Sequence, residues 1–405
     1  MNLPPKILLL SLCALMPASS IEIELRYDYD TSGFFNQPGA KEAMRACADF
    51  FENILTDSLT EINAATSGSS QNTWSARPEH PSTGEMLNLV DLVVPRDTMI
   101  IFLGARDFPN GTNAVATTGK SATGFAPFLN TVTQRGQSGA GTTPATDYGP
   151  WGGSISFDSR LDDGSPRQWN FSTSRSMSGR TNFVGVALHE LCHLMGFGIA
   201  PSFKDLVPVG EVVFTGPTSK VANGGVEPLV RQDKGHWTST SPGPYFLPTY
   251  GSFGTSHGRL QRALMDSRVE GTSTRLAVLT DLELAALIDV GWEVALPAGE
   301  IQTVEPVNGG LQISFPTTSN FVYRIQRGDL LTPFANLGDP IQGDGSVQTY
   351  LDENPPALKG FYRFTMSRAP SAGTRALRRE PAADEKAGVR TVSDWWKSEG
   401  CCEHE

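Results

Sequence analysis

The chain is poor in cysteine and histidine, and it lacks the long apolar runs of a membrane protein. Of its 405 residues, five are cysteines and six are histidines. After the N-terminal leader, no segment approaches the ~20 consecutive apolar residues that a membrane-spanning helix needs. The cysteines are too few and too scattered for a disulfide framework. We therefore expect a soluble globular protein whose fold does not depend on disulfide bonds.

Basic residues are also in deficit. The sequence has 32 lysines and arginines against 43 aspartates and glutamates, which gives a formal net charge of -11. Such a surface repels phosphate backbones and anionic membranes. We expect no nucleic-acid partner and no stable membrane insertion, and we expect a monomer.

Residues 1–20 have the pattern of a secretory signal peptide. Lys6 supplies a positive start, Ile7 to Met16 an apolar stretch, and Ala18 to Ser20 a small-residue cleavage region. This pattern predicts export to the extracellular space, with the periplasm or the cell surface as alternatives. A strand pattern begins at once after the leader, so no candidate pro-segment is expected.

Four cysteines follow the leader. Cys47 falls in a predicted helix, Cys192 in the motif described below, and Cys401 and Cys402 near the end of the sequence. Burial in the core explains the first two, because free cysteine is commonly a small buried apolar residue. A Cys47–Cys192 disulfide remains the alternative.

The first three hundred residues mix strand and helix patterns. Residues 21–29 alternate with period two, residues 39–62 carry apolar side chains at helical spacing, and residues 98–103 are rich in β-branched residues. Residues 111–150 lack clear periodicity and predict loops with short extended pieces. A capping box at Thr280 to Glu283 predicts a helix ending at Gly291, near the end of the domain.

The short alternating segment 152–158 is typical of an edge strand. An edge strand can bind an extended peptide through main-chain hydrogen bonds. We expect this segment to do so, the alternative being a sheet edge that binds no ligand.

The composition changes after residue 300. Short alternating runs, such as 311–315 and 321–325, are separated by Asn-Gly, Asp-Gly and Pro turns. They predict a small all-β sandwich module over residues 297–368. Beyond it the chain is charged and nearly aperiodic, so residues 369–405 are predicted to form a disordered tail despite Trp395 and Trp396.

The strongest signal lies in residues 184–196. Apolar residues at helical spacing and a capping residue at Asn182 or Thr181 predict a helix. His189 and His193 are four residues apart, so both imidazoles lie on one helix face and can bind one Zn²⁺. A chance match on a surface helix is the alternative, and the scarcity of histidine disfavours it.

This pattern is typical of peptide hydrolysis chemistry. Three protein ligands leave a coordination position for water, whose pKa zinc lowers toward ~7. Glu190, next to the first ligand, can accept a proton from that zinc-bound water and pass it to the leaving amine, as general base and then acid.

A third ligand must come from further along the chain. The extended zinc motif would place a histidine six residues after His193, but that position is Ile199. His236, His257 and Glu211 are the candidates. Glu211 lies in an extended segment, which disfavours it.

Three segments together resemble a known family. His189 to Gly198 (HELCHLMGFG), then Gly235-His236-Trp237 and later Leu264-Met265-Asp266, resemble the leishmanolysin-like branch of the metzincin zinc metallopeptidases and related bacterial secreted proteases. The resemblance implies that His236 is the third zinc ligand, that Glu190 is the base and that Met265 forms a methionine turn below the metal.

The resemblance extends over residues 21–296. It implies an α+β, metzincin-like zincin catalytic domain with a twisted sheet and long helices, followed by the β module. The expected activity is that of a secreted zinc endopeptidase acting on protein or peptide substrates. The alternatives are a secreted adhesion or carbohydrate-binding protein with a structural zinc site, and a cell-wall peptide amidase.

Overall fold

The fold of the protein comes from a computed structural model. The structure describes residues 21–109, 111–238, 246–248, 260–266, 276–294, 301, 303–308, 310–317, 321–328, 335–343, 346–355, 361–368 and 389–397. The predicted leader, His257 and the terminal cysteines lie outside these residues. The larger of two compact units combines Ser20–Ala295 with the C-terminal segment Ala376–Glu405, and the smaller holds Leu296–Arg375.

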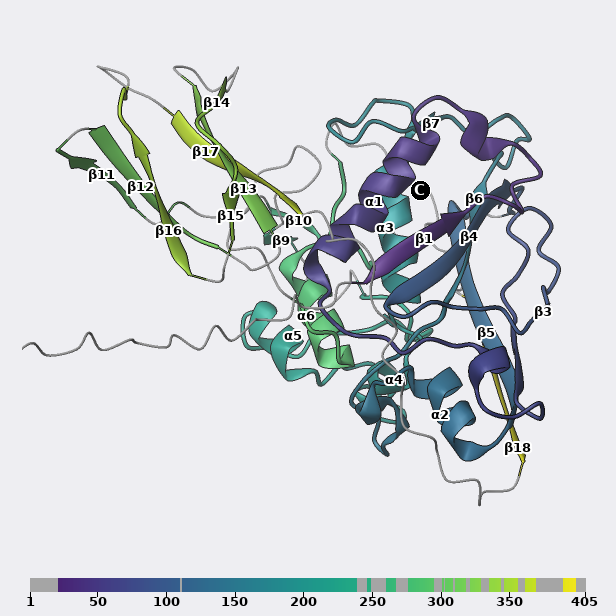
Figure 1. The fold of residues 1–405 in the computed structure, drawn as a ribbon. Helices are drawn as coiled ribbons and strands as arrows, with labels where there is room; N and C mark the ends of the chain where they lie inside the picture. Colours follow the sequence, from purple (N-terminus) through teal and green to yellow (C-terminus); the bar gives the residue numbers. More distant parts are fainter. Residues whose placement is uncertain are drawn as a thin grey trace, which may run out of the picture. The chain divides into compact units, whose positions relative to one another are not determined.

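The larger unit is built on a curled mixed sheet (Figure 1). Hydrogen-bonded strands follow one another in the path β1-β4-β6-β5-β2-β3, and a further strand, β18, also pairs with β5. Strands β1, β4 and β6 are parallel, whereas β5 is antiparallel to β6. The strand bounds are β1 Glu22–Arg26, β2 Thr73–Ala76, β3 Leu89–Val90, β4 Thr98–Arg106, β5 Ala114–Gly124, β6 Gly152–Asp158 and β18 Arg390–Lys397.

Helices pack on both faces of this sheet. Helix α2 (Ala126–Gln134) shares a core cluster with Ile100 and Phe102 of β4. Because side chains alternate along a strand, Met99, Ile101 and Leu103 face the other side, where α1 (Ala40–Ile54) and α3 (Phe183–Leu194) lie next to each other. The remaining elements are η1 Phe34–Asn36, η2 Ala64–Thr66, η3 Ser138–Gly141, β7 Trp169–Asn170, β8 Thr181–Asn182, α4 Pro201–Asp205, α5 Pro217–Ala222, β9 Phe246–Pro248, β10 Leu260–Arg262 and α6 Asp281–Val290.

Most of the predicted elements are present with shifted ends. Strand β1 and helix α1 are shorter than the predicted segments 21–29 and 39–62, and β4 extends three residues past its predicted end. The predicted loop region 111–150 contains an 11-residue strand, β5, and a helix, α2. Its strand was missed because mostly Ala, Gly and Thr fill the buried positions, so no apolar alternation marks it.

The prediction that residues 152–158 form an edge strand is wrong. Strand β6 lies between β4 and β5, and all seven of its residues are buried. The hydroxyl of Ser154 donates to the carbonyl oxygen of Glu79 at 2.7 Å and lies 2.8 Å from the hydroxyl of Thr117. The polar side chains of the alternating pattern are thus satisfied inside the protein and do not face solvent.

The prediction of a disordered tail is also wrong where the structure describes it. Residues 390–397 form β18, antiparallel to β5 over eight residue pairs. The side chain of Val392 packs against the core cluster of the sheet. Residues 369–388 and 398–405 lie outside the described residues.

The smaller unit contains two antiparallel sheets. One has the order β11-β12-β16, and in the other β13 pairs with β14, β15 and β17. Ile313 and Phe315 of β12 form one buried cluster with Tyr323 and Ile325 of β13. The bounds are β11 Thr303–Val307, β12 Gly310–Pro316, β13 Phe321–Gly328, β14 Ala335–Asn336, β15 Ile341–Gln342, β16 Val347–Asp352 and β17 Phe361–Arg368.

Within the described ranges, no helix is both long enough and apolar enough to cross a membrane.

A buried arginine joins several loops of the larger unit. The guanidinium of Arg135 is fully buried and donates to the carbonyl oxygens of Thr60, Pro95, Thr98 and Pro150 at 2.7–2.9 Å. These four carbonyls come from three separate segments, so one side chain fixes where β4 and β6 begin.

Replacing Arg135 should destabilise the protein strongly. In Arg135→Met the apolar chain keeps most of its volume, but the four carbonyls lose the guanidinium donors, although that of Pro95 keeps the N–H of Thr98 as a donor. At ~1–3 kcal/mol for each unsatisfied buried group, we expect a loss of about 3 kcal/mol or more. Urea unfolding measures it, with Arg160→Met as control, because Arg160 is exposed and donates to a single carbonyl. Equal unfolding midpoints for the two variants would contradict this role.

A buried carboxyl should make the stability depend on pH. Asp57 is 3% exposed and accepts a hydrogen bond from the backbone N–H of Glu293. Burial raises the pKa of Asp57 to about 7, and the nearby Glu293 and Asp147 add to the shift. Its contribution to stability is full below pH ~4, the pKa in the unfolded chain, and is lost as pH rises through about 7.

Asp57→Asn should remove this dependence, since the amide oxygen still accepts the hydrogen bond and carries no charge. We expect the melting temperature of the variant, relative to the wild type, to rise between pH 5 and pH 8. The shift corresponds to at most about 4 kcal/mol. A difference that stays constant with pH would show that Asp57 is ionised in the folded protein throughout.

Candidate metal centre

Helix α3 carries the first two histidines through the interior of the protein. It begins after Asn182, whose side chain accepts a hydrogen bond from the N–H of Gly185, and all twelve of its residues are buried. A helix that is apolar on every side is a core helix. The alternative of a chance motif on a surface helix is therefore excluded, because His189, Glu190 and His193 are each 0% exposed.

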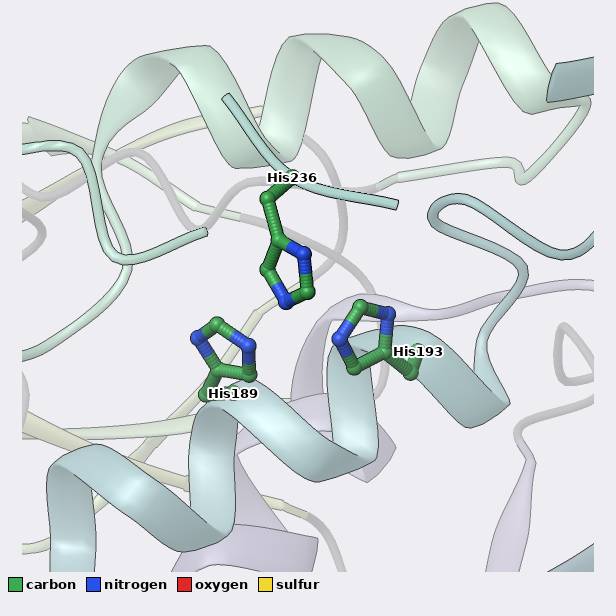
Figure 2. Close-up of side chains that lie close together, drawn as sticks. All are labelled: His189, His193 and His236. Carbon is green, nitrogen blue, oxygen red and sulfur yellow. The ribbon is translucent and has the colours of Figure 1, made fainter. Parts of the chain in front are cut away.

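His236 joins these two histidines. The ring centroids of His189 and His193 lie 4.9 Å apart, and the ring of His236 lies 5.3 Å and 5.1 Å from them. Figure 2 shows the three rings facing a common point, with one nitrogen of each directed toward it. In the part of the chain that the structure describes, this is the one cluster of histidine, cysteine or acidic side chains that could hold a metal ion.

Backbone carbonyls fix the orientation of the two helix histidines. Nδ1 of His189 lies 2.8 Å from the carbonyl oxygen of Leu264, and Nδ1 of His193 lies 2.9 Å from that of Phe197. A carbonyl oxygen can only accept, so each Nδ1 carries the proton. Each Nε2 is then the unprotonated nitrogen and can bind a metal ion.

A carboxylate plays the same part for His236. Nδ1 of His236 lies 3.2 Å from Oδ2 of Asp233, and Oδ1 of Asp233 accepts from the N–H of Gly235. Burial alone would raise the pKa of Asp233, but its hydrogen bonds, chiefly with His236, lower that pKa. An ionised carboxylate behind a ligating imidazole is a common support in zinc sites.

The electrostatics keep the helix imidazoles neutral. Burial, reinforced by the nearby His236, lowers the pKa of His189 to about 3. Burial and the two neighbouring imidazoles hold the pKa of His193 well below its usual range. Nε2 of His189 is buried and has no hydrogen-bond partner among the described residues. Neutral imidazoles are the form that binds Zn²⁺, and a divalent ion would give Nε2 of His189 the partner that it lacks among the described residues.

Two glycines let the chain bring His236 close to the helix. Gly196 has φ 110°, and a Cβ there would lie 2.9–3.0 Å from atoms of Tyr148, Ala200 and Val290. Gly198 has φ 76°, and a Cβ there would lie 2.7 Å from Cα of Gly235. The backbone after α3 can turn at Gly196 and pass this close to Gly235 at Gly198 because neither position carries a side chain.

The residue after His236 fixes it from the other side. The N–H of Trp237 donates to the carbonyl oxygen of Met265 at 2.8 Å. Its indole ring is buried and lies 4.8 Å from the ring of Phe197 and 5.5 Å from that of Phe214. The Gly-His-Trp segment is thus held both by the aromatic core and by the turn that contains Met265.

Glu283 has a second role that sequence reasoning missed. It completes the predicted capping box of α6 by accepting from the N–H and hydroxyl of Thr280. Its other oxygen accepts from the N–H of Met265 at 3.1 Å, and the carboxyl is fully buried. Glu283 therefore fixes the turn whose Leu264 carbonyl orients His189. Its place in the capping box was its one signal in the sequence.

The structure also places the other residues that the sequence singled out. Glu211 is exposed and is not part of the histidine cluster, which removes it as a ligand. The side chain of Met265 is fully buried. Cys47 and Cys192 are buried free thiols, so the alternative of a disulfide between them is wrong.

Sequence reasoning also missed Trp396, whose ring lies 5.3 Å from that of His193.

The chain matches no protein family, no curated protein and no solved structure in our comparisons.

The choice between His236 and His257 can be tested by counting zinc. His236→Ala should reduce bound zinc from about one ion per chain to near zero after dialysis, because two imidazoles alone hold zinc weakly. His257→Ala should leave the zinc content unchanged. Elemental analysis of both purified variants measures this, and retention of zinc by His236→Ala with loss in His257→Ala would reverse the assignment.

Proposed function

We propose that the protein is a secreted zinc-dependent endopeptidase. His189, His193 and His236 would hold the zinc ion, and Glu190 would act as general base and acid. The observation that carries this proposal is the convergence of three buried imidazoles. Two of them lie on helix α3, which also carries the buried Glu190 next to His189. Burying these polar groups together in an apolar core is unfavourable unless they have a partner, and a bound metal ion would be that partner.

The number of ligands supports a catalytic site. Structural zinc sites have four protein ligands, whereas catalytic sites have three and leave a position for water or substrate. Across the described residues, the cluster has three members, all histidines. This composition disfavours the alternative of an adhesion protein with a structural zinc ion.

The chemistry follows from the donor set. His189, His193 and His236 would hold the zinc ion, which when bound would supply Lewis acidity and lower the pKa of water toward ~7. The Glu190 carboxylate then removes a proton from the attacking water as its oxygen bonds to the carbonyl carbon. When the C–N bond breaks, Glu190 returns that proton to the leaving nitrogen, so the protons balance.

The wider proposal concerns the fold and the location. The parallel strands, the antiparallel β5 and the histidine-bearing core helix support a metzincin-like zincin domain over residues 21–296. The two sheets of the smaller unit, which share the cluster around Phe315 and Tyr323, support a β-sandwich module over 297–368. The leader pattern supports export to the extracellular space.

Replacing the proposed base should separate catalysis from metal binding. Glu190→Gln should lower hydrolysis of casein by about 10²–10⁴-fold, because the amide cannot accept the proton. Its zinc content should stay at about one ion per chain. Glu211→Gln is the matched control, since Glu211 is exposed and outside the cluster, and it should keep full activity.

The wild-type activity should also be lost with a chelator and restored by zinc. Full activity in Glu190→Gln would refute the role of Glu190. Purified wild-type protein that holds zinc and hydrolyses no protein substrate would refute the proposed function.

A further inference from the structure

One edge of β5 is covered by the C-terminal strand of the same chain. β6 and β2 pair with β5 along one edge, through residues 114–117 and 120–123 respectively. β18 pairs with residues 117–124, overlapping both, so it lies along the opposite edge. β18 is thus the outermost strand beside β5, and it is the segment that a peptide would have to replace there.

This strand leads to the metal centre. The pairing runs antiparallel, from Arg390 opposite Gly124 to Lys397 opposite Thr117. Near its end, the half-buried indole of Trp396 lies 5.3 Å from the imidazole of His193, tilted by 50°. An extended segment of the chain therefore places a large side chain directly against a proposed zinc ligand.

The contacts of β18 are those of a bound peptide. Its main chain pairs along β5, while single side chains make separate contacts, as in strand addition to a sheet edge. Val392 packs against the core cluster, and the hydroxyl of Thr391 lies 3.1 Å from that of Thr123. Nζ of Lys397 lies 3.0 Å and 3.2 Å from the two carboxylate oxygens of Glu79.

These contacts are weak enough to be reversible. Arg390, Thr391, Ser393 and Asp394 are exposed, and Val392, Trp396 and Lys397 are only half-buried. The ion pair between Lys120 and Asp394 is long, at 3.6 Å, and the Asp394 side chain is 63% exposed. A long ion pair with one exposed partner contributes little to stability. No described side chain of β18 is part of the fully buried core, so the sheet can lose the strand.

We propose that β18 occupies the peptide-binding edge of the active site and competes with substrate, so that the full chain is autoinhibited. This inference rests on the proposed endopeptidase function. A substrate peptide would pair with β5 in place of residues 390–397 and would have to displace Trp396 from His193. Because the inhibitor belongs to the same chain, its effective concentration is high, and weak contacts suffice to slow binding.

Breaking the strand within the full chain tests the proposal. Alternate N–H groups of an antiparallel strand donate to its neighbour, so one of the adjacent residues Ser393 and Asp394 must donate to β5. The double variant Ser393→Pro/Asp394→Pro removes both donors. The matched control Ser393→Ala/Asp394→Ala loses the same side chains, including the Lys120 pair, but keeps both N–H groups.

The proline variant should hydrolyse a fluorogenic peptide with kcat/KM at least about tenfold above wild type, while the alanine control stays close to it. The gain follows because the competent fraction of the enzyme rises. Equal kcat/KM in the proline variant, the alanine control and the wild type would overturn autoinhibition.

Two measurements do not depend on activity. In the proline variant, amide hydrogen exchange in residues 117–124 should become faster, and a chelator should remove zinc faster because Trp396 no longer lies beside His193. A synthetic peptide of residues 389–397 should bind this variant and restore the slow exchange. The same peptide with Trp396→Ala should bind more weakly. Unchanged exchange in the proline variant, or no binding of the peptide, would overturn the proposal.

The two proposals fail in different ways. If the proline variant shows faster exchange and binds the peptide but neither it nor the wild type hydrolyses substrate, the endopeptidase function is wrong and the peptide-binding edge stands. If both hydrolyse substrate and the synthetic peptide does not inhibit the proline variant competitively, the function stands and autoinhibition is wrong.

Discussion

The hydrogen bond behind each imidazole is the interaction on which the centre depends. A neutral histidine offers one donor and one acceptor nitrogen, and the partner of the donor decides which nitrogen can bind a metal. Here Nδ1–H of each ring donates a hydrogen bond: His189 to the Leu264 carbonyl, His193 to the Phe197 carbonyl and His236 to the Asp233 carboxylate. Each ring therefore has one tautomer and one orientation, and the ε nitrogens converge.

Each of these acceptors is positioned by a different part of the fold. The Phe197 carbonyl depends on the turn at Gly196 and Gly198, and the Leu264 carbonyl depends on Glu283 of α6. Without an ion, this arrangement lowers the stability of the fold, because a buried nitrogen without a partner has lost its hydrogen bonds to water. Binding a metal would offset this loss of stability, so metal binding would stabilise the segment that carries His236.

Local patterns in the sequence predicted the elements but not their neighbours. The spacing of His189 and His193 is fixed by helical geometry, so their shared face could be read from the sequence. His236 lies far along the chain, in a segment with no periodicity, and only the family resemblance singled it out. The partners of Nδ1 could not be predicted, because two of them are backbone carbonyls that any residue could provide.

The wrong predictions for residues 152–158 and 390–397 share one physical cause, because the pairing of both strands depends on distant parts of the chain. Alternation of apolar and polar residues shows that a segment is extended, but not whether its polar side chains meet solvent or buried partners. Ser154 and Ser156 are buried in β6, whereas Thr391 and Ser393 are exposed in β18. Burial depends on which strands pair, and pairing across more than two hundred residues, as between Thr123 and Thr391, leaves no local signal.

An open strand edge serves a peptide-binding enzyme and endangers a secreted protein. The unpaired N–H and C=O groups that would bind substrate would also pair with any other extended chain, which leads to aggregation. In the proposed enzyme, a strand from the same chain would satisfy those groups while substrate is absent, and its exposed side chains would let it leave. The polar, partly charged sequence of β18 suits this role better than an apolar strand would, because an apolar strand would join the core and close the edge permanently.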